Sequence, residues 1–120
     1  MDFKRQRVIK AVYDFSVSGG TTGDITLGRY IPSNFIVTNI YHKENTNVTS
    51  GGSATVTLSA GSTALTGAIA KATFNGVNSE ALASSATAIN ISTACELKIT
   101  IGTADLTAGK VTFYVVGIVE

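Results

Sequence analysis

The chain of 120 residues contains one cysteine, one histidine and one proline, has no tryptophan, and carries charge on only 14% of its residues. A single cysteine excludes an internal disulfide, and one cysteine with one histidine cannot by themselves build a zinc site. The charged share is about half that of an average globular protein, which argues against a disordered acidic tail or a nucleic-acid coat. These absences remove several functions before any motif is considered.

No run of 18 apolar residues occurs, and the N-terminus lacks the apolar stretch and small-residue cleavage site of a signal peptide. We expect a soluble protein without membrane contact, made in a reducing cytoplasm. The one cysteine, Cys95, shares a strand face with Leu97, Ile99 and Ile101 in the segment CELKITI. Because free cysteines are usually buried, the sequence predicts a buried, unreactive thiol there.

The residues that are present follow a period of two, which is typical of β-strands and not of helices. In VIKAVYDFSV the polar residues Lys10, Asp14 and Ser16 fall on one face. The opposite face collects Ile9, Ala11, Tyr13, Phe15 and Val17. One apolar and one polar face are expected of a strand in an antiparallel sheet that covers a core on one side.

Two further segments indicate which side chains fill the interior. SATVTLS alternates most regularly, with Ala54, Val56 and Leu58 predicted to point inward and hydroxyl side chains outward. NFIVTNIYH is partly apolar on both faces, as in a central strand of a sandwich. Its two predicted faces are Phe35, Val37, Asn39 and Tyr41, and Ile36, Thr38, Ile40 and His42.

The remaining segments complete an all-β prediction. We expect strands at residues 24–27, 87–92, 95–101 and 111–119, one or two more within 64–74, a weak helical turn competing in NSEALASSA (78–86), and a turn in ADLTAGK (104–110). About eight short strands separated by turns predict a single-domain antiparallel β-sandwich, with a jelly roll as its expected form. The sandwich domain spans residues 8–120, and residues 1–10 form a basic arm that leads into the first strand.

The sequence shows no catalytic, metal or cofactor site. The one histidine, His42, is predicted at a solvated strand end, and the eight carboxylates are scattered along the chain without the spacing of an acid/base pair or a calcium loop. We therefore expect a protein that is not an enzyme and needs no cofactor.

The N-terminal arm concentrates positive charge, because four of the nine basic residues are Lys4, Arg5, Arg7 and Lys10. One interpretation is a solvated or frayed terminus. The other is an electrostatic contact with an acidic protein surface. Nucleic-acid binding ranks below both interpretations, because no second basic patch with interleaved aromatic residues accompanies the arm.

Three segments carry a resemblance to a known family. They are the LG..IP stretch from Leu27 to Pro32, the TSGGSATV block from Thr49 to Val56, and LTAGK from Leu106 to Lys110. From about Ile25 onward the chain resembles small structural proteins of tailed bacteriophages that decorate or cement capsids. The resemblance implies a β-sandwich or jelly roll bound to the capsid exterior, with the major capsid protein as partner and often a trimeric assembly.

Strands with two apolar faces, such as IVTNI and VTFYVVGIV, also favour a homo-oligomer, and we expect a trimer. Candidate contact groups are the basic residues of the arm and the aromatic residues Phe3, Tyr30 and Tyr41. Phe35, Phe74 and Tyr114 are further candidates, and any of these aromatic residues fits a core position at least as well.

Two alternatives to a capsid cement remain open. The first is another position in the particle, such as a head fibre, tail component or connector. The second is a carbohydrate-binding jelly roll for host attachment, for which the missing tryptophan is unfavourable. The copy number per particle separates cement from the first alternative, and a glycan array tests the second.

Overall fold

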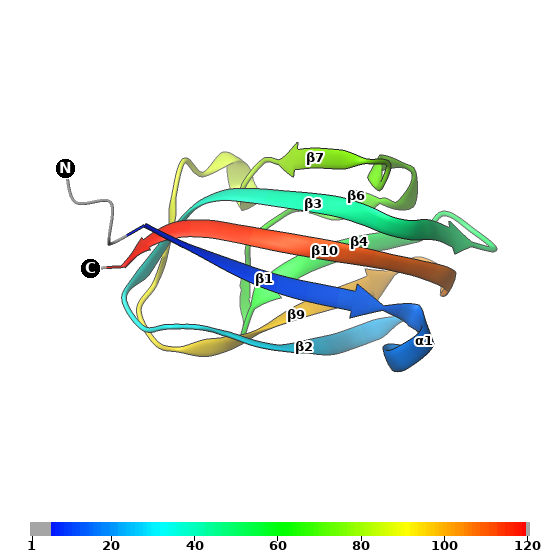
Figure 1. The fold of residues 1–120 in the computed structure, drawn as a ribbon, viewed down its shortest axis with the longest axis horizontal. Helices are drawn as coiled ribbons and strands as arrows, with labels where there is room; N and C mark the ends of the chain where they lie inside the picture. The colour runs from blue at the N-terminus through cyan, green and yellow to red at the C-terminus, as the bar shows by residue number, and fades with distance from the viewer. Residues whose placement is uncertain (1–5, 120) are drawn as a thin grey trace.

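Two antiparallel β-sheets face each other across one apolar core (Figure 1). The computed structural model describes residues 6–119. The strands of this part of the chain are β1 (Gln6–Asp14), β2 (Gly23–Ile31), β3 (Phe35–Ser50), β4 (Thr55–Ala60), β5 (Thr63–Ala64), β6 (Ile69–Ala70), β7 (Val77–Glu80), β8 (Ile89–Ile91), β9 (Cys95–Gly102) and β10 (Leu106–Val119). A helical turn, α1 (Phe15–Ser18), and two 3-10 turns, η2 (Lys71–Thr73) and η3 (Ala83–Ser85), connect them.

The strand order is that of a jelly roll. Sheet A has the order β1-β10-β3-β7, with the short β8 also paired to β3. Sheet B has the order β2-β9-β4-β5, with β6 also paired to β4. The chain alternates between the sheets at both of its ends, so β1, β3 and β10 lie in one sheet and β2, β4 and β9 in the other (Figure 1). The all-β sandwich predicted from the sequence is confirmed, and its strand order is the jelly-roll form.

The core forms where alternating side chains of both sheets meet. Ala54, Val56 and Leu58 are buried, as predicted. From β9 the core receives Leu97, Ile99 and Ile101, and from β10 it receives Val111, Phe113 and Val115. The period of two therefore identified Ala54, Val56 and Leu58 of β4 and the face of Leu97, Ile99 and Ile101 in β9 correctly, although Ser59, predicted to point outward, is also buried.

One extra residue in β3 makes the predicted faces wrong beyond Val37. Against β10, Val37 pairs with Gly117 and Asn39 with Val116, so Thr38 is an unpaired bulge residue. The Thr38 hydroxyl donates a hydrogen bond of 3.2 Å to the carbonyl of Val116. A bulge moves every later side chain to the opposite face. Ile40 and His42 consequently point into the core, while Asn39 and Tyr41 are exposed.

The first strand ends three residues earlier than predicted. Asp14 caps the turn α1, because its Oδ1 accepts hydrogen bonds from the backbone N–H of Ser16 at 3.0 Å and from the Ser16 hydroxyl at 2.7 Å. Gly19, at a φ of 73°, closes the turn by donating its N–H to the carbonyl of Phe15. Val17 is therefore 81% exposed instead of buried on a strand face.

Other boundaries also differ from the prediction. Strand β2 continues to Ile31, beyond the predicted residues 24–27, and β3 continues to Ser50. Strand β7 occupies residues that include the start of the predicted helical turn, and the one helical turn that follows, η3, begins at Ala83. Strand β10 already starts at Leu106, inside the predicted turn. Register shifts on both sides of Ala108, with Gly109 at a φ of 138°, allow the LTAGK segment to remain in the sheet.

Candidate interaction surfaces

The face of sheet A that points away from the core is unusually apolar. Five large apolar side chains are exposed on it: Val8, Val12, Tyr41, Val77 and Ile118. They come from all four principal strands of the sheet, which Figure 1 shows in front of sheet B. We call this surface the outer face of sheet A.

The pairing register sets the neighbours of these residues across the strands. Tyr41 of β3 lies directly opposite Tyr114 of β10, Val8 of β1 lies opposite Val116 of β10, and Val77 of β7 lies opposite Lys43. Residues directly opposite on neighbouring strands share a face and contact each other. Exposed apolar side chains gathered on one face are typical of a protein contact.

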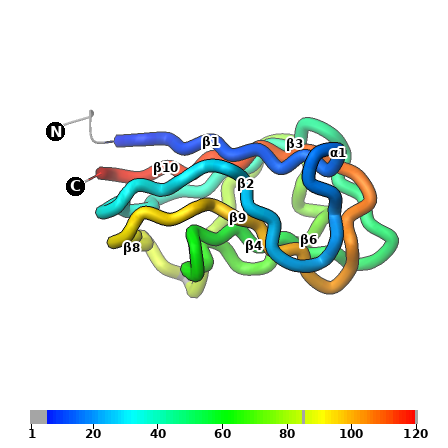
Figure 2. Tube along the Cα trace, turned by 90° about the horizontal axis from the view of Figure 1, so that it is seen from below, coloured from blue at the N-terminus to red at the C-terminus, as the bar shows by residue number. Residues whose placement is uncertain are grey.

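A second surface runs along the open side of the sandwich, where the edge strands β1 and β2 lie side by side (Figure 2). One hollow of about 520 Å³ is lined by Val8, Ile9 and Lys10 from β1 and by Gly28, Arg29 and Tyr30 from β2. A second, of about 480 Å³, continues past Gly28 toward α1. Its lining residues are Val12, Asp14, Val17, Ser18, Thr26, Leu27, Gly28 and Lys110. We call the two hollows together the edge groove.

The backbone beside the edge groove is open for pairing. Within residues 6–119, β1 pairs with β10 alone and β2 with β9 alone. The β2 ladder also jumps from the pair Thr26 with Lys98 to the pair Tyr30 with Glu96, so three residues of β2 oppose one of β9. Gly28, at a φ of 72°, lies at the centre of this bulge. Bulges of this kind are found at exposed sheet edges and bend them.

Positive charge gathers at one end of the edge groove. Arg7, Lys10 and Arg29 are exposed, and none of them has an ion-pair partner among the residues that the structure describes. At the other end, Asp14 faces Lys110 in the strand register. The groove is therefore basic beside Val8 and Tyr30 and nearly neutral beside α1.

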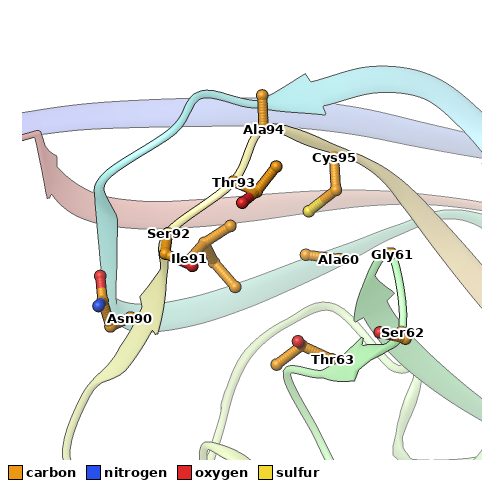
Figure 3. A pocket seen from close by; sticks show the side chains of 10 residues that line it. All are labelled: Ala60, Gly61, Ser62, Thr63, Asn90, Ile91, Ser92, Thr93, Ala94 and Cys95. Carbon is orange, nitrogen blue, oxygen red and sulfur yellow. The ribbon is translucent and has the colours of Figure 1, made fainter.

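A third hollow, of about 210 Å³, lies between the β4–β5 turn and the segment that joins β8 to β9 (Figure 3). Its walls carry small hydroxyl and amide groups, with Cys95 at one side. The Cys95 thiol is only partly buried, so the prediction of a buried thiol is wrong. Partial burial still raises the pKa of this thiol, which keeps it protonated and poorly reactive at neutral pH. No aromatic residue lines this hollow for a sugar ring to stack on.

His42 is fully buried, so its predicted place at a solvated strand end is wrong. Its Nε2 lies 3.0 Å from Oε2 of Glu80 on β7, while its Nδ1 is buried without a hydrogen-bond partner. The ring packs on Phe74 at a centroid distance of 4.8 Å and on Phe113 at 6.4 Å. Inside this apolar setting the histidine connects two strands and is not accessible to a substrate.

Residues 6–119 contain no group of three or more histidine, cysteine, aspartate or glutamate side chains placed to hold a metal ion. In the same part of the chain, no helix has the length and apolarity needed to cross a membrane.

The structure places the sequence-predicted contact residues on different surfaces. Arg7 and Lys10 belong to strand β1, Tyr30 is 65% exposed in the edge groove, and Tyr41 is 38% exposed on the outer face of sheet A. Phe35 and Phe74 are core residues, and Tyr114 is half-buried. Phe3, Lys4 and Arg5 lie outside the described residues.

Sequence reasoning missed Arg29, Val77 and Ile118. Arg29 is distant from the basic arm in sequence and joins it only because β1 and β2 form neighbouring edges. The exposure of Val77 and Ile118 follows from which face of sheet A covers the core. The alternation in the last strand contained part of this signal, since Ile118 is out of phase with Val111, Phe113 and Val115.

The fold defines the chain as a jelly-roll β-sandwich, and chains in three solved phage capsid structures share this fold. A chain in the acidic stable capsid structure of Helicobacter pylori bacteriophage KHP30 matches with a TM-score of 0.65 at 12% identity, over 95% of this chain and 87% of that one. A chain in the cyanophage Pam1 capsid asymmetric unit matches with a TM-score of 0.65 at 14% identity, over 96% and 85%.

A chain in the capsid of Ralstonia phage GP4 matches with a TM-score of 0.62 at 15% identity, over 95% of this chain and 85% of that one. No protein-family model matches the sequence, and no curated protein matches it significantly. The expected relation to phage capsid proteins is thus confirmed at the level of the fold.

Proposed function

We propose that this chain is a structural protein of a tailed-phage particle, and specifically a decoration or cement protein on the outside of the head. The observation that carries the proposal is the nearly full-length match in fold to chains of three phage capsid structures. The two open surfaces of the sandwich support a function in protein contact. The proposed activity is mechanical and not enzymatic, and it requires no cofactor, nucleic acid or membrane.

A cement protein stabilises the capsid because it binds the assembled capsid lattice in preference to free capsid subunits. A protein that binds the assembled lattice more tightly than its dissociated subunits stabilises the lattice by mass action. The partner would be the major capsid protein, held across the boundary between neighbouring subunits. The basic residues Lys4, Arg5, Arg7 and Lys10 are the proposed capsid contacts.

The part of the outer face of sheet A around Tyr41 and Val77 is the proposed contact between copies of this chain, with three copies as the favoured assembly. Val8 and Val12, at the β1 border of this face, line the edge groove instead. Tyr41 lies on this face, while Tyr30 and Phe3 are assigned to the capsid side. A contact of standard size buries roughly 800 Å² per partner. A molecule with 6318 Å² of accessible surface therefore has room for a capsid contact and for two contacts within a trimer.

The test uses heads of the parent phage assembled without this protein. Purified protein is added back, and DNA release is followed with a dye while the heads are heated. We expect saturable binding at a fixed ratio to the major capsid protein and a higher temperature of DNA release. Absence of binding to the heads, or binding at the tail alone, would contradict the cement function and favour a fibre, tail or connector position.

A further inference from the structure

The edge groove has the features of a site for an extended peptide segment. We propose that it receives an extended, acidic segment of a capsid subunit, which adds a strand to the open edge of β1. The inference rests on the proposed function and specifies the chemistry of its capsid contact. It concerns Arg29, Tyr30 and the β1 edge, which the sequence did not bring together.

The backbone of β1 is open on one side. Strand β1 has nine residues and forms one of the free edges of sheet A within the described chain. At a rise of about 3.3 Å per residue, this edge extends over roughly 30 Å. Figure 2 shows it running beside β2 along most of the molecule. An added strand gains affinity from main-chain hydrogen bonds and specificity from pockets for alternate side chains.

The lining of the edge groove is partly apolar. In the first hollow, β1 contributes Val8, which is 60% exposed, and the half-buried Ile9, while β2 contributes Tyr30, which is 65% exposed. Val12 and Leu27 continue the apolar lining in the second hollow. An extended segment can therefore place apolar side chains along the groove while its backbone pairs with β1.

The groove also carries positive charge. The hollow beside Val8 and Tyr30 is lined by Lys10 and Arg29, and the exposed Arg7 precedes Val8 on β1. Carboxylates of a bound segment over this end would pair with these cations, and complementary charge guides partners together and fixes their register. The nearly neutral end of the groove beside α1 does not favour acidic side chains in the bound segment. The acidic part of the segment is therefore assigned to the Arg7 end of β1.

The same charges disfavour a second copy of this chain as the occupant. Two β1 strands related by a two-fold axis would bring Arg7 and Lys10 of both copies to one ladder, and like charges on neighbouring strands are destabilising. Basic residues on a sheet edge commonly prevent such self-pairing. The edge thus rejects its own copy and accepts a segment that supplies carboxylates.

The test compares binding of purified variants to the heads assembled without this protein. Arg29→Glu reverses a charge in the edge groove, and Lys71→Glu makes the same charge change on η2, which belongs neither to the edge groove nor to the outer face of sheet A. We expect Arg29→Glu to weaken binding about tenfold or more, because attraction becomes repulsion, while Lys71→Glu binds the heads like the wild type. Thermal unfolding of both variants verifies that the substitutions leave the fold intact.

Hydrogen exchange on the heads provides the second measurement. If a strand is added to β1, backbone amides of β1 that exchange in the free protein become protected in the bound protein. Equal binding by Arg29→Glu and wild type, equal loss in both variants, or unchanged exchange in β1 would each overturn the groove assignment while leaving the capsid function standing. Failure of the wild type itself to bind the heads would overturn the proposed function and, with it, this inference.

Discussion

At the residue scale, Gly117 shows how closely β10 packs against the first residues of β3. A Cβ atom at this buried position would collide with the carbonyl oxygen of Ile36 and with the ring of Phe35. The ring of Phe35, itself fully buried, can pack there only because residue 117 has no side chain.

We therefore expect Gly117→Ala to lower the free energy of unfolding by about 1–3 kcal/mol or more, since overpacking a core displaces its neighbours. Urea denaturation measures the loss. Gly67→Ala is the matched control, because nothing lies within 4 Å of a Cβ added at Gly67. Equal stability of the two variants would show that the predicted collision is absent.

Tyr13 connects the first strand to the turn that follows it. Its buried hydroxyl donates a hydrogen bond of 2.6 Å to the carbonyl of Gly19. Burial, and to a lesser degree the nearby charge of Asp14, raise the pKa of Tyr13 above its usual value. The folded state therefore opposes ionisation of this phenol more than the unfolded chain does.

Tyr13→Phe should lower the free energy of unfolding by about 1 kcal/mol at neutral pH, because it removes one hydrogen bond. Below pH 10 the wild type keeps the full contribution of the neutral phenol, and it loses this contribution as the pH rises toward the raised pKa. The stability difference between wild type and Tyr13→Phe should therefore stay constant up to about pH 10 and shrink as the pH rises above it. Chemical denaturation at several pH values measures it, and a constant difference would contradict the pKa shift.

At the scale of the elements, β7 is held to the sandwich by few interactions. It pairs with β3 over four residues, and Glu80 reaches His42 in the core. Removal of the carboxylate would leave both ring nitrogens of His42 buried without a partner.

Glu80→Ala should therefore destabilise the protein by about 1–3 kcal/mol, the usual cost of an unsatisfied buried polar group. Glu80→Gln keeps an oxygen and an amide for the histidine and should cost less. Thermal and urea unfolding compare the two variants. A smaller loss in Glu80→Ala than in Glu80→Gln would mean that the hydrogen bond to His42 contributes little.

The alternation of apolar and polar residues predicted the positions of the regular strands well, but it did not predict bulges or strand ends. It located the core residues of β4 and β9, because burial of one face leaves a period of two in the sequence. It could not locate the bulge at Thr38, because a threonine inserted into an apolar strand leaves no local signal, and the faces of Ile40 and His42 were therefore assigned wrongly. The end of β1 could have been found, since Asp14, Ser16 and Gly19 together form a helix cap and a stop.

At the scale of the whole molecule, the two candidate surfaces have different origins. Which residues are exposed on the outer face of sheet A depends on which side of the sheet covers the core. The alternation of apolar and polar residues in the sequence indicates this in part. The edge groove depends on which strands end as neighbouring edges, and this strand order is a tertiary property that the sequence pattern did not determine. Arg29 and the basic arm were therefore unconnected until the fold joined them.

The outer face of sheet A makes a prediction about assembly. At sufficient concentration the protein should sediment at three times the chain mass of 12.4 kDa. Replacing two exposed apolar side chains of this face, Tyr41→Ser with Val77→Ser, should return it to a monomer, because the apolar contact area is lost. Val17→Ser is the control, since Val17 is exposed on α1 away from this face. Sedimentation equilibrium distinguishes the outcomes, and a variant that stays trimeric would place the contact elsewhere.

As a decoration protein, this jelly roll would cover the outside of a phage head. A cryo-electron microscopy reconstruction of the phage particle that contains the protein tests this directly. We expect β-sandwich density at symmetry-related sites on the outer surface of the shell, with the edge of β1 and β2 turned toward the capsid subunits. A bare shell, with this density found only at the tail or at a single vertex, would contradict it.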